Sequence, residues 1–184
     1  NFFSLCFISP SQADDIKNCQ IDGITVGDSL LDHYSKEEIN AGLKKTNSSY
    51  TSKRFIRNTL RTKGNNIYNH IGVHYKNDGS YEIGQVAGLI FYRNNIDECY
   101  SKQKEVANEI ASLFPSSKKK HNKFKYSRDE KSTFDQISYK LKSGDIIILC
   151  RDWSKKKEKK WVDNLSIQIR TSEYIDWLRY EANK

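Results

Sequence analysis

Apolar and polar positions alternate along residues 71–75 and 81–92, as expected for two half-buried β-strands. The segment between them, Asn77-Asp78-Gly79-Ser80, has the composition of a tight turn, so the strands are predicted to form an antiparallel hairpin. In residues 96–113 apolar residues recur instead every three or four positions. This spacing predicts a helix, and Asn95 is placed to cap its first turn.

The remaining segments carry shorter patterns. Residues 44–66 are polar and basic, with one β-favouring stretch at Phe55-Ile56, and are expected to be irregular or to form an edge strand. A basic loop is expected after the 96–113 helix and another before the last strand. The other predicted elements are an early helix capped by Asp28 or Ser35, strands over 133–141, 146–150 and 162–170, and a final helix capped by Thr171 or Ser172.

This order of elements, α-β-β-α-β-β-β-α, predicts the α+β class. Short turns make neighbouring strands antiparallel, so we expect a single antiparallel sheet of about five strands with helices packed on one face. The length of 184 residues suits one hydrophobic core. We therefore expect residues 14–184 to form one domain.

The first thirteen residues are uncharged and begin with an apolar run, Phe2 to Ile8, which is too short to span a bilayer. Small residues follow at Ser11-Gln12-Ala13, and the charges start at Asp14. Residues 1–13 are interpreted as the end of a truncated signal peptide, which predicts a periplasmic or secreted protein without a transmembrane segment in the mature chain. A buried first strand is the alternative interpretation.

Removing that segment would leave three cysteines in an oxidising compartment, Cys19, Cys99 and Cys150. Cys99 falls in the first turn of the 96–113 helix and Cys150 at the end of a predicted strand, so the two are candidates for a disulfide across the core. Two buried free thiols remain an equal alternative, because pairing cannot be deduced from sequence. Cys19 would then be left without a partner.

Two lysine-rich segments account for the net charge of +8. If the fold brings them to one edge, they would form a patch for phosphate, anionic lipid or nucleic acid, and two tryptophans beside the second segment would suit a membrane interface or base stacking. The alternative is that both are solvated loops. The candidate anion-binding residues are Lys118, Lys119, Lys120, Lys123, Lys155, Lys156, Lys157, Trp153 and Trp161.

One short motif suggests catalysis. Gly27-Asp28-Ser29-Leu30 resembles the motif of the GDSL esterases and lipases, a resemblance that implies Ser29 as a nucleophile. Acyl transfer needs a positioned base, and the Asp-x-x-His that the family carries near its C-terminus is missing. Asp28 as a helix cap explains the same residues. The scattered histidines predict no metal site, and no cofactor motif is present.

A second resemblance rests on three longer sequence segments: 24–35 (ITVGDSLLDHYS), 95–103 (NIDECYSKQ) and 150–154 (CRDWS). Together they resemble a family of short, uncharacterised exported proteins from marine bacteria with AT-rich genomes. The resemblance implies a signal peptide and a small α+β domain, and it implies no active site. In layout alone, the chain is also similar to small envelope lipoproteins that assist outer-membrane assembly.

These observations predict a non-catalytic exported module that binds a protein or envelope partner. The alternatives are a serine esterase or lipase using Ser29, and binding of anionic lipid or phosphate through the basic loops. A nucleic-acid partner conflicts with export.

Overall fold

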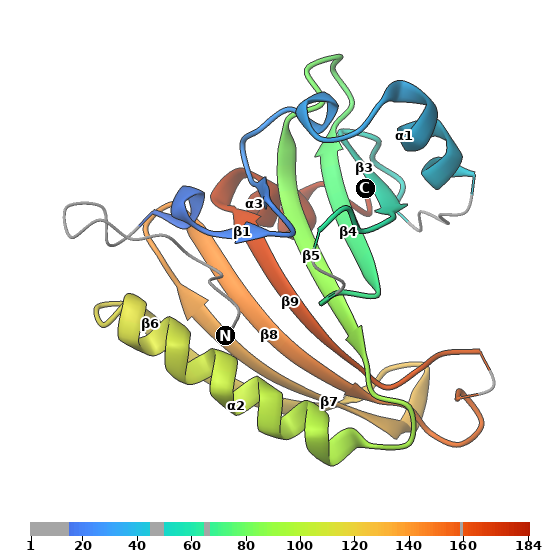
Figure 1. Cartoon of the computed structure of the whole chain (residues 1–184), viewed down its shortest axis with the longest axis vertical. Helices are drawn as coiled ribbons and strands as arrows, with labels where there is room; N and C mark the ends of the chain where they lie inside the picture. Colours follow the sequence, from blue (N-terminus) through green and yellow to red (C-terminus); the bar gives the residue numbers. More distant parts are fainter. Residues whose placement is uncertain (1–14, 45–49, 65–66, 159) are drawn as a thin grey trace.

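The computed structural model describes residues 15–44, 50–64, 67–158 and 160–184, and its main feature is a seven-stranded antiparallel sheet (Figure 1). Every neighbouring pair of strands in this sheet is antiparallel. In spatial order the strands are β3 (Phe55–Leu60), β4 (His70–Lys76), β5 (Ile83–Phe91), β9 (Asn164–Thr171), β8 (Gly144–Asp152), β7 (Asp129–Lys140) and β6 (Lys118–Tyr126).

The predicted single sheet of about five strands is wrong, because the described structure has seven strands in one sheet and two in another. The small sheet pairs β1 (Gln20–Ile21) with β2 (Ile24–Thr25) around a turn in which Asp22 and Gly23 have positive φ. In the large sheet, β6 occupies most of the segment that was expected to be a basic loop. The result is a mostly-sheet protein with three α-helices in the described residues.

The elements with the clearest periodicity form as predicted. β4 and β5 pair as an antiparallel hairpin, and α2 (Ile96–Leu113) begins after Asn95, whose side chain accepts a hydrogen bond from the Glu98 amide. Thr171 caps α3 (Ser172–Tyr180) in the same way. The remaining helical segments are η1 (Ile16–Asn18), η2 (Leu30–Asp32) and α1 (Lys36–Leu43), the last with a complete capping box formed by Ser35 and Glu38.

The helices cover both faces of the sheet, so the expectation of helices on one face is also wrong. Successive side chains of a strand point to opposite faces. On β8, Ile146 and Ile148 therefore join the main core beneath α2, whereas Ile147 faces the other side. On that other side α3 buries Tyr174 and Trp177 against Phe55 of β3.

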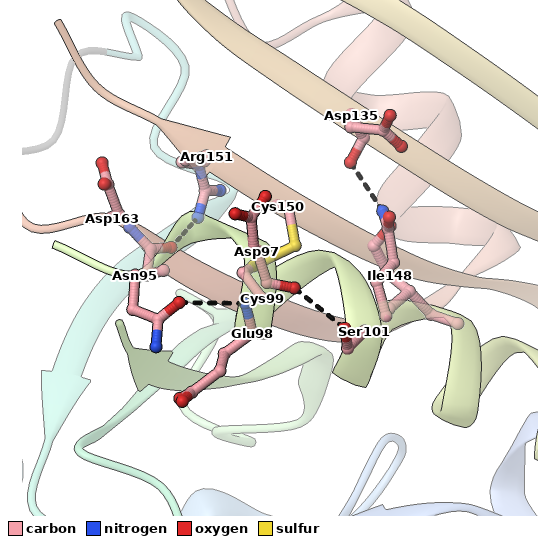
Figure 2. Close-up of a disulfide and its surroundings, with 12 residues drawn as sticks. Asn95, Asp97, Glu98, Cys99, Ser101, Asp135, Ile148, Cys150, Arg151 and Asp163 are labelled. Atoms are coloured by element: carbon pink, nitrogen blue, oxygen red, sulfur yellow. Dashed lines mark hydrogen bonds between the residues drawn. A yellow bond between two sulfur atoms is a disulfide. The ribbon is translucent and has the colours of Figure 1, made fainter. Parts of the chain in front are cut away.

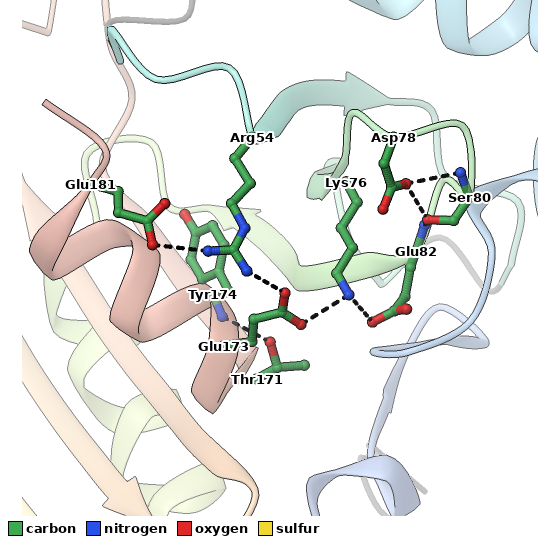
Figure 3. Close-up of polar contacts among 9 residues, drawn as sticks. All are labelled: Arg54, Lys76, Asp78, Ser80, Glu82, Thr171, Glu173, Tyr174 and Glu181. Carbon is green, nitrogen blue, oxygen red and sulfur yellow. Dashed lines mark hydrogen bonds and ion pairs between the residues drawn. The ribbon is translucent and has the colours of Figure 1, made fainter. Parts of the chain in front are cut away.

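A network of ion pairs holds α3 against the β3–β4–β5 end of the sheet (Figure 3). The guanidinium of Arg54 contacts the carboxylates of Glu173 and Glu181 at 2.7 and 2.9 Å, and Lys76 contacts Glu173 and Glu82 at 2.9 and 3.0 Å. These side chains are substantially exposed apart from Lys76, so each pair contributes little alone. Together they fix the orientation of the helix.

A disulfide joins Cys99 of α2 to Cys150 of β8, with the two Cα atoms 6.1 Å apart (Figure 2). Both residues are fully buried in the main core. The bond therefore ties the first turn of α2 to β8, and of the two alternatives for these cysteines the structure has the disulfide.

Cys19 is also disulfide-bonded, and no described cysteine is free. The expectation of an unpaired third cysteine applies to the chain without residues 1–13, so it stays a prediction. The predicted signal peptide, residues 1–13, lies outside the described residues. Among the helices that the structure describes, none has the length and apolar character needed to cross a bilayer.

Candidate functional site

β6 forms one edge of the large sheet and holds an unusual concentration of lysine. The strand reads Lys-Lys-Lys-His-Asn-Lys-Phe-Lys-Tyr, and seven of its nine residues are exposed. It pairs with β7 in continuous register from Lys118, opposite Lys140, to Lys125, opposite Thr133. Phe124 anchors it on one face, with its ring centroid 5.7 Å from that of Phe134.

The lysines project from both faces of this edge strand. Register with β7 places Lys118, Lys120 and Phe124 on the face of Phe134, and Lys119, Lys123 and Lys125 on the face that α2 covers. Both faces of the edge are therefore positively charged.

The described contacts of these lysines are with aromatic rings and a hydroxyl group rather than with carboxylates. Lys119 lies 5.8 Å from the ring centroid of Tyr139, and Lys123 lies 5.2 Å from that of Tyr100. Lys125 donates a hydrogen bond to Thr133 Oγ1 at 2.9 Å. The positive charge of the edge is thus left available to an external partner.

Of the carboxylates on the neighbouring strand β7, Asp135 lies opposite a lysine of β6. Asp135 is the cross-strand partner of Lys123, but its carboxylate is hydrogen-bonded to Nε2 of His121 at 2.7 Å. Asp135 is buried, whereas His121 is largely exposed. Asp135 therefore offsets only part of the charge on β6.

The second basic segment meets the far end of β6 through an aromatic cluster. The Trp153 and Trp161 ring centroids are 4.3 Å apart, and both rings pack edge-on against Tyr126 of β6, at 5.4 and 6.0 Å. Lys157 lies over Trp161, 5.0 Å from its ring centroid. We call the surface formed by Tyr126, Trp153, Lys157 and Trp161 the tip cluster.

Hydrogen bonds also join the β6–β7 turn to the loop after β8. Asp129, at the start of β7, accepts hydrogen bonds from the hydroxyl groups of Ser132 and Ser154, at 2.7 and 2.5 Å. These bonds, first of all the one from Ser154, lower the pKa of Asp129. The carboxylate therefore stays ionised and joins the β6–β7 turn to the loop after β8.

The loop's lysines lie among carboxylates, one of which, Asp152, also interacts with Lys123 and Lys125 of β6. Lys155 forms an ion pair with Glu158 at 3.2 Å. Burial raises the pKa of Asp152, although Lys123, Lys125 and Lys155 oppose that shift. A pocket of about 990 Å³ beside the loop is lined by six carboxylates, Asp97, Asp129, Glu130, Asp152, Glu158 and Asp163, but by only three lysines, Lys131, Lys155 and Lys156.

The nine predicted anion-binding residues therefore separate into two groups. Lys123 lies near the tip cluster with Trp153, Trp161 and Lys155–Lys157, whereas Lys118–Lys120 lie towards the other end of β6. Nine residues of extended chain span about 26 Å, so the two ends of β6 cannot contact one small anion together. The predicted anion-binding residues therefore lie along the β6 edge and beside the tip cluster rather than in one compact pocket.

The geometry around Ser29 does not form a catalytic serine site. Ser29 has an extended backbone, pairs with Glu82 in an isolated β-bridge and donates its hydroxyl proton to the carbonyl of Ser80 at 3.0 Å. The nearby His33 is hydrogen-bonded through Nε2 to Asp28 at 3.1 Å. In the described structure no histidine is hydrogen-bonded to Ser29, so no base is in position to activate it.

A metal centre is not formed either within the described ranges, where no group of three or more His, Cys, Asp and Glu side chains could hold an ion. His70 and His74 lie four residues apart on β4, at a spacing of about 13 Å along an extended strand. His70 is exposed and His74 is buried. The two side chains therefore cannot bind the same metal ion.

Comparisons with protein-family models, with curated proteins and with solved structures return no match to this chain. The β6 edge and the tip cluster are therefore the structural basis for the function of this protein proposed below.

Proposed function

We propose that this protein is an exported, non-catalytic binding module that holds an anionic partner along the β6 edge. The observation that carries the proposal is the row of five lysines on an exposed edge strand, three of which contact aromatic rings or a hydroxyl group. Such a row raises the local concentration of an oppositely charged partner and orients it along the strand.

The binding role is also supported by what surrounds Ser29. Ser29 belongs to the only sequence motif that suggests catalysis, and its hydroxyl group donates a hydrogen bond to a backbone carbonyl. The imidazole of the neighbouring His33 is hydrogen-bonded to Asp28. Export is supported by the Cys99–Cys150 disulfide, because such bonds persist in oxidising compartments. We place the protein in the periplasm or outside the cell on this basis and on the apolar segment of residues 1–13.

A charge-reversal experiment tests the β6 edge as the binding surface. The edge variant is Lys118→Glu/Lys120→Glu/Lys123→Glu, and the matched control is Lys36→Glu/Lys104→Glu/Lys142→Glu, which changes the net charge equally at exposed positions. Binding of fluorescein-labelled poly-L-glutamate is measured by anisotropy at several salt concentrations. We expect the edge variant to lose at least about tenfold in affinity, or 1.4 kcal/mol, and the control to change by less than about threefold.

Equal losses in the two variants would contradict the proposal, because they would mean that only net charge matters. Circular dichroism in the near ultraviolet establishes that both variants remain folded. The affinity of the unchanged protein should fall as salt rises, since exposed charges are screened beyond about 8 Å at physiological ionic strength.

A second candidate function is binding of phosphate groups, free or on an anionic lipid surface, at the tip cluster. The observation that favours it is an exposed aromatic side chain beside a lysine: Trp161 is 39% exposed and Lys157 lies over its ring. Aromatic rings of this kind suit a lipid interface. Cosedimentation with vesicles containing phosphatidylglycerol, lost in Lys155→Glu/Lys156→Glu/Lys157→Glu but not in the edge variant, would favour this function over the first.

A further inference from the structure

The β6 edge has a second property besides its charge: it is an open strand edge. β6 is the last strand of the sheet, and β7 occupies only one of its two sides. The backbone N–H and C=O groups that point away from β7 form the kind of row to which another strand can be added. The strand is nine residues long, which is enough for a partner to pair over several hydrogen bonds.

The opposite edge is not equally open. β3 lies beside α1, where the side-chain amide of Asn58 donates a hydrogen bond to the carbonyl of Ile39 at 2.8 Å. Just beyond the strand, the Tyr34 hydroxyl donates to the carbonyl of Arg61 at 2.7 Å. Among the described residues, β6 is therefore the edge with room for an additional strand.

The charges on β6 determine which strand could be added. A second copy of this chain would bring lysines opposite lysines, because the row extends over the whole strand and onto both faces. Like charges directly opposite one another in a sheet are destabilising. An acidic strand would gain cross-strand ion pairs at the same positions, so the edge rejects self-association and accepts a partner of opposite charge.

The aromatic position refines the description of the partner. On the Phe134 face Phe124 follows Lys118 and Lys120 along the strand, and it is 44% exposed. A strand placed alongside would set an apolar side chain next to Phe124 and acidic side chains next to Lys118 and Lys120 on that face. On the α2 face its acidic residues would meet Lys119, Lys123 and Lys125.

We infer that the partner held at the β6 edge is an acidic, extended polypeptide segment that adds to the sheet as an eighth strand. The inference rests on the proposed function and specifies its ligand. Main-chain hydrogen bonds provide affinity in such complexes, and the alternating side chains provide selectivity. The acidic residues lie on both faces of the added strand, with one apolar residue opposite Phe124.

Backbone methylation of a peptide separates strand addition from simple charge attraction. The probe is a nine-residue peptide of Glu and Thr with one Val at its third position, which lies opposite Phe124 when the peptide pairs antiparallel with β6 in full register. Two further versions carry N-methyl groups on alternate residues, on the odd positions in one and the even positions in the other. All three have the same charge, but each methylated version can donate hydrogen bonds from only one of its two edges.

Strand addition predicts that one methylated version binds like the parent peptide and that the other binds at least about tenfold more weakly. It also predicts slower hydrogen exchange of β6 backbone amides when the parent peptide is bound. Equal binding of all three peptides would overturn the strand-addition inference and leave the basic edge as an electrostatic site. If the parent peptide binds the unchanged protein and the edge variant equally, the proposed function fails as well.

Discussion

Replacing Cys99 and Cys150 together with alanine is expected to lower the free energy of unfolding by about 4 kcal/mol. The disulfide closes a loop with a sequence separation of 51 residues, which holds α2, β6, β7 and most of β8. Without it the unfolded chain regains the entropy that the closed loop had removed. Loss of the buried sulfur atoms adds to the effect, because both residues are fully buried.

Urea denaturation of the double variant against the unchanged protein measures this difference. Replacing one alanine by valine, in Cys99→Ala/Cys150→Val, restores part of the lost volume and separates packing from loop closure. A decrease below about 1 kcal/mol in both variants would contradict a substantial stabilising role for the bond.

Acidification is expected to destabilise the protein through His74. This imidazole is 7% exposed, and neither ring nitrogen has a hydrogen-bond partner in the described structure. Its ring centroid lies 5.0 Å from that of Tyr174 and 6.2 Å from that of Tyr50. Burial, with a smaller contribution from the positive charge of Arg57, lowers the pKa of His74 from 6.5 to about 3.

The sign of the effect follows from proton binding. Between about pH 6.5 and pH 3 the unfolded chain holds a proton at His74 that the folded protein does not. Stability therefore rises with pH through this window and is lost as pH falls through it. At 1.36 kcal/mol per pKa unit, the full loss is on the order of 5 kcal/mol.

His74→Leu is the variant that isolates this contribution. Its free energy of unfolding should depend less on pH between about pH 6.5 and 5.5, above the pH range in which ordinary carboxylates titrate. Asp78, Asp129 and Glu173 also have lowered pKa values and destabilise the protein in acid, but at lower pH. Parallel pH profiles for His74→Leu and the unchanged protein would show that His74 does not carry the acid sensitivity.

The elements that the sequence predicted well have strong local signals. The Asp78-Gly79 turn with its flanking alternation specified the β4–β5 hairpin, and the Asn95 cap with an 18-residue periodic segment specified α2. The Thr171 cap did the same for α3. In these segments propensity, patterning and capping all favour the same structure.

The β6 strand was missed because its local sequence argues against a strand. Lysine has low β propensity, and no apolar alternation is present until Phe124. What makes the segment a strand is its pairing with β7 and the packing of Phe124 on Phe134, which are contacts across a hairpin and not within the segment itself. Within the segment itself, Phe124 and Tyr126 were the only residues that indicated a strand.

The layer arrangement also could not be deduced from periodicity. The α3 helix starts directly after β9, and its apolar side chains face Phe55 on β3, more than a hundred residues earlier. Nothing in the local pattern says to which face of the sheet a helix turns. Similarly, the sequence identified the lysines of the anion-binding candidates but not that those at 118–125 line an open edge, while those at 155–157 sit near carboxylates.

Backbone amide chemical shifts measured during titration with poly-L-glutamate test the central claim most directly. If the β6 edge holds the anionic partner, the largest changes will fall within residues 118–126 and their β7 partners, and they will disappear in the Lys118→Glu/Lys120→Glu/Lys123→Glu variant. Largest changes in residues 153–161, or changes spread evenly over exposed lysines, would contradict it.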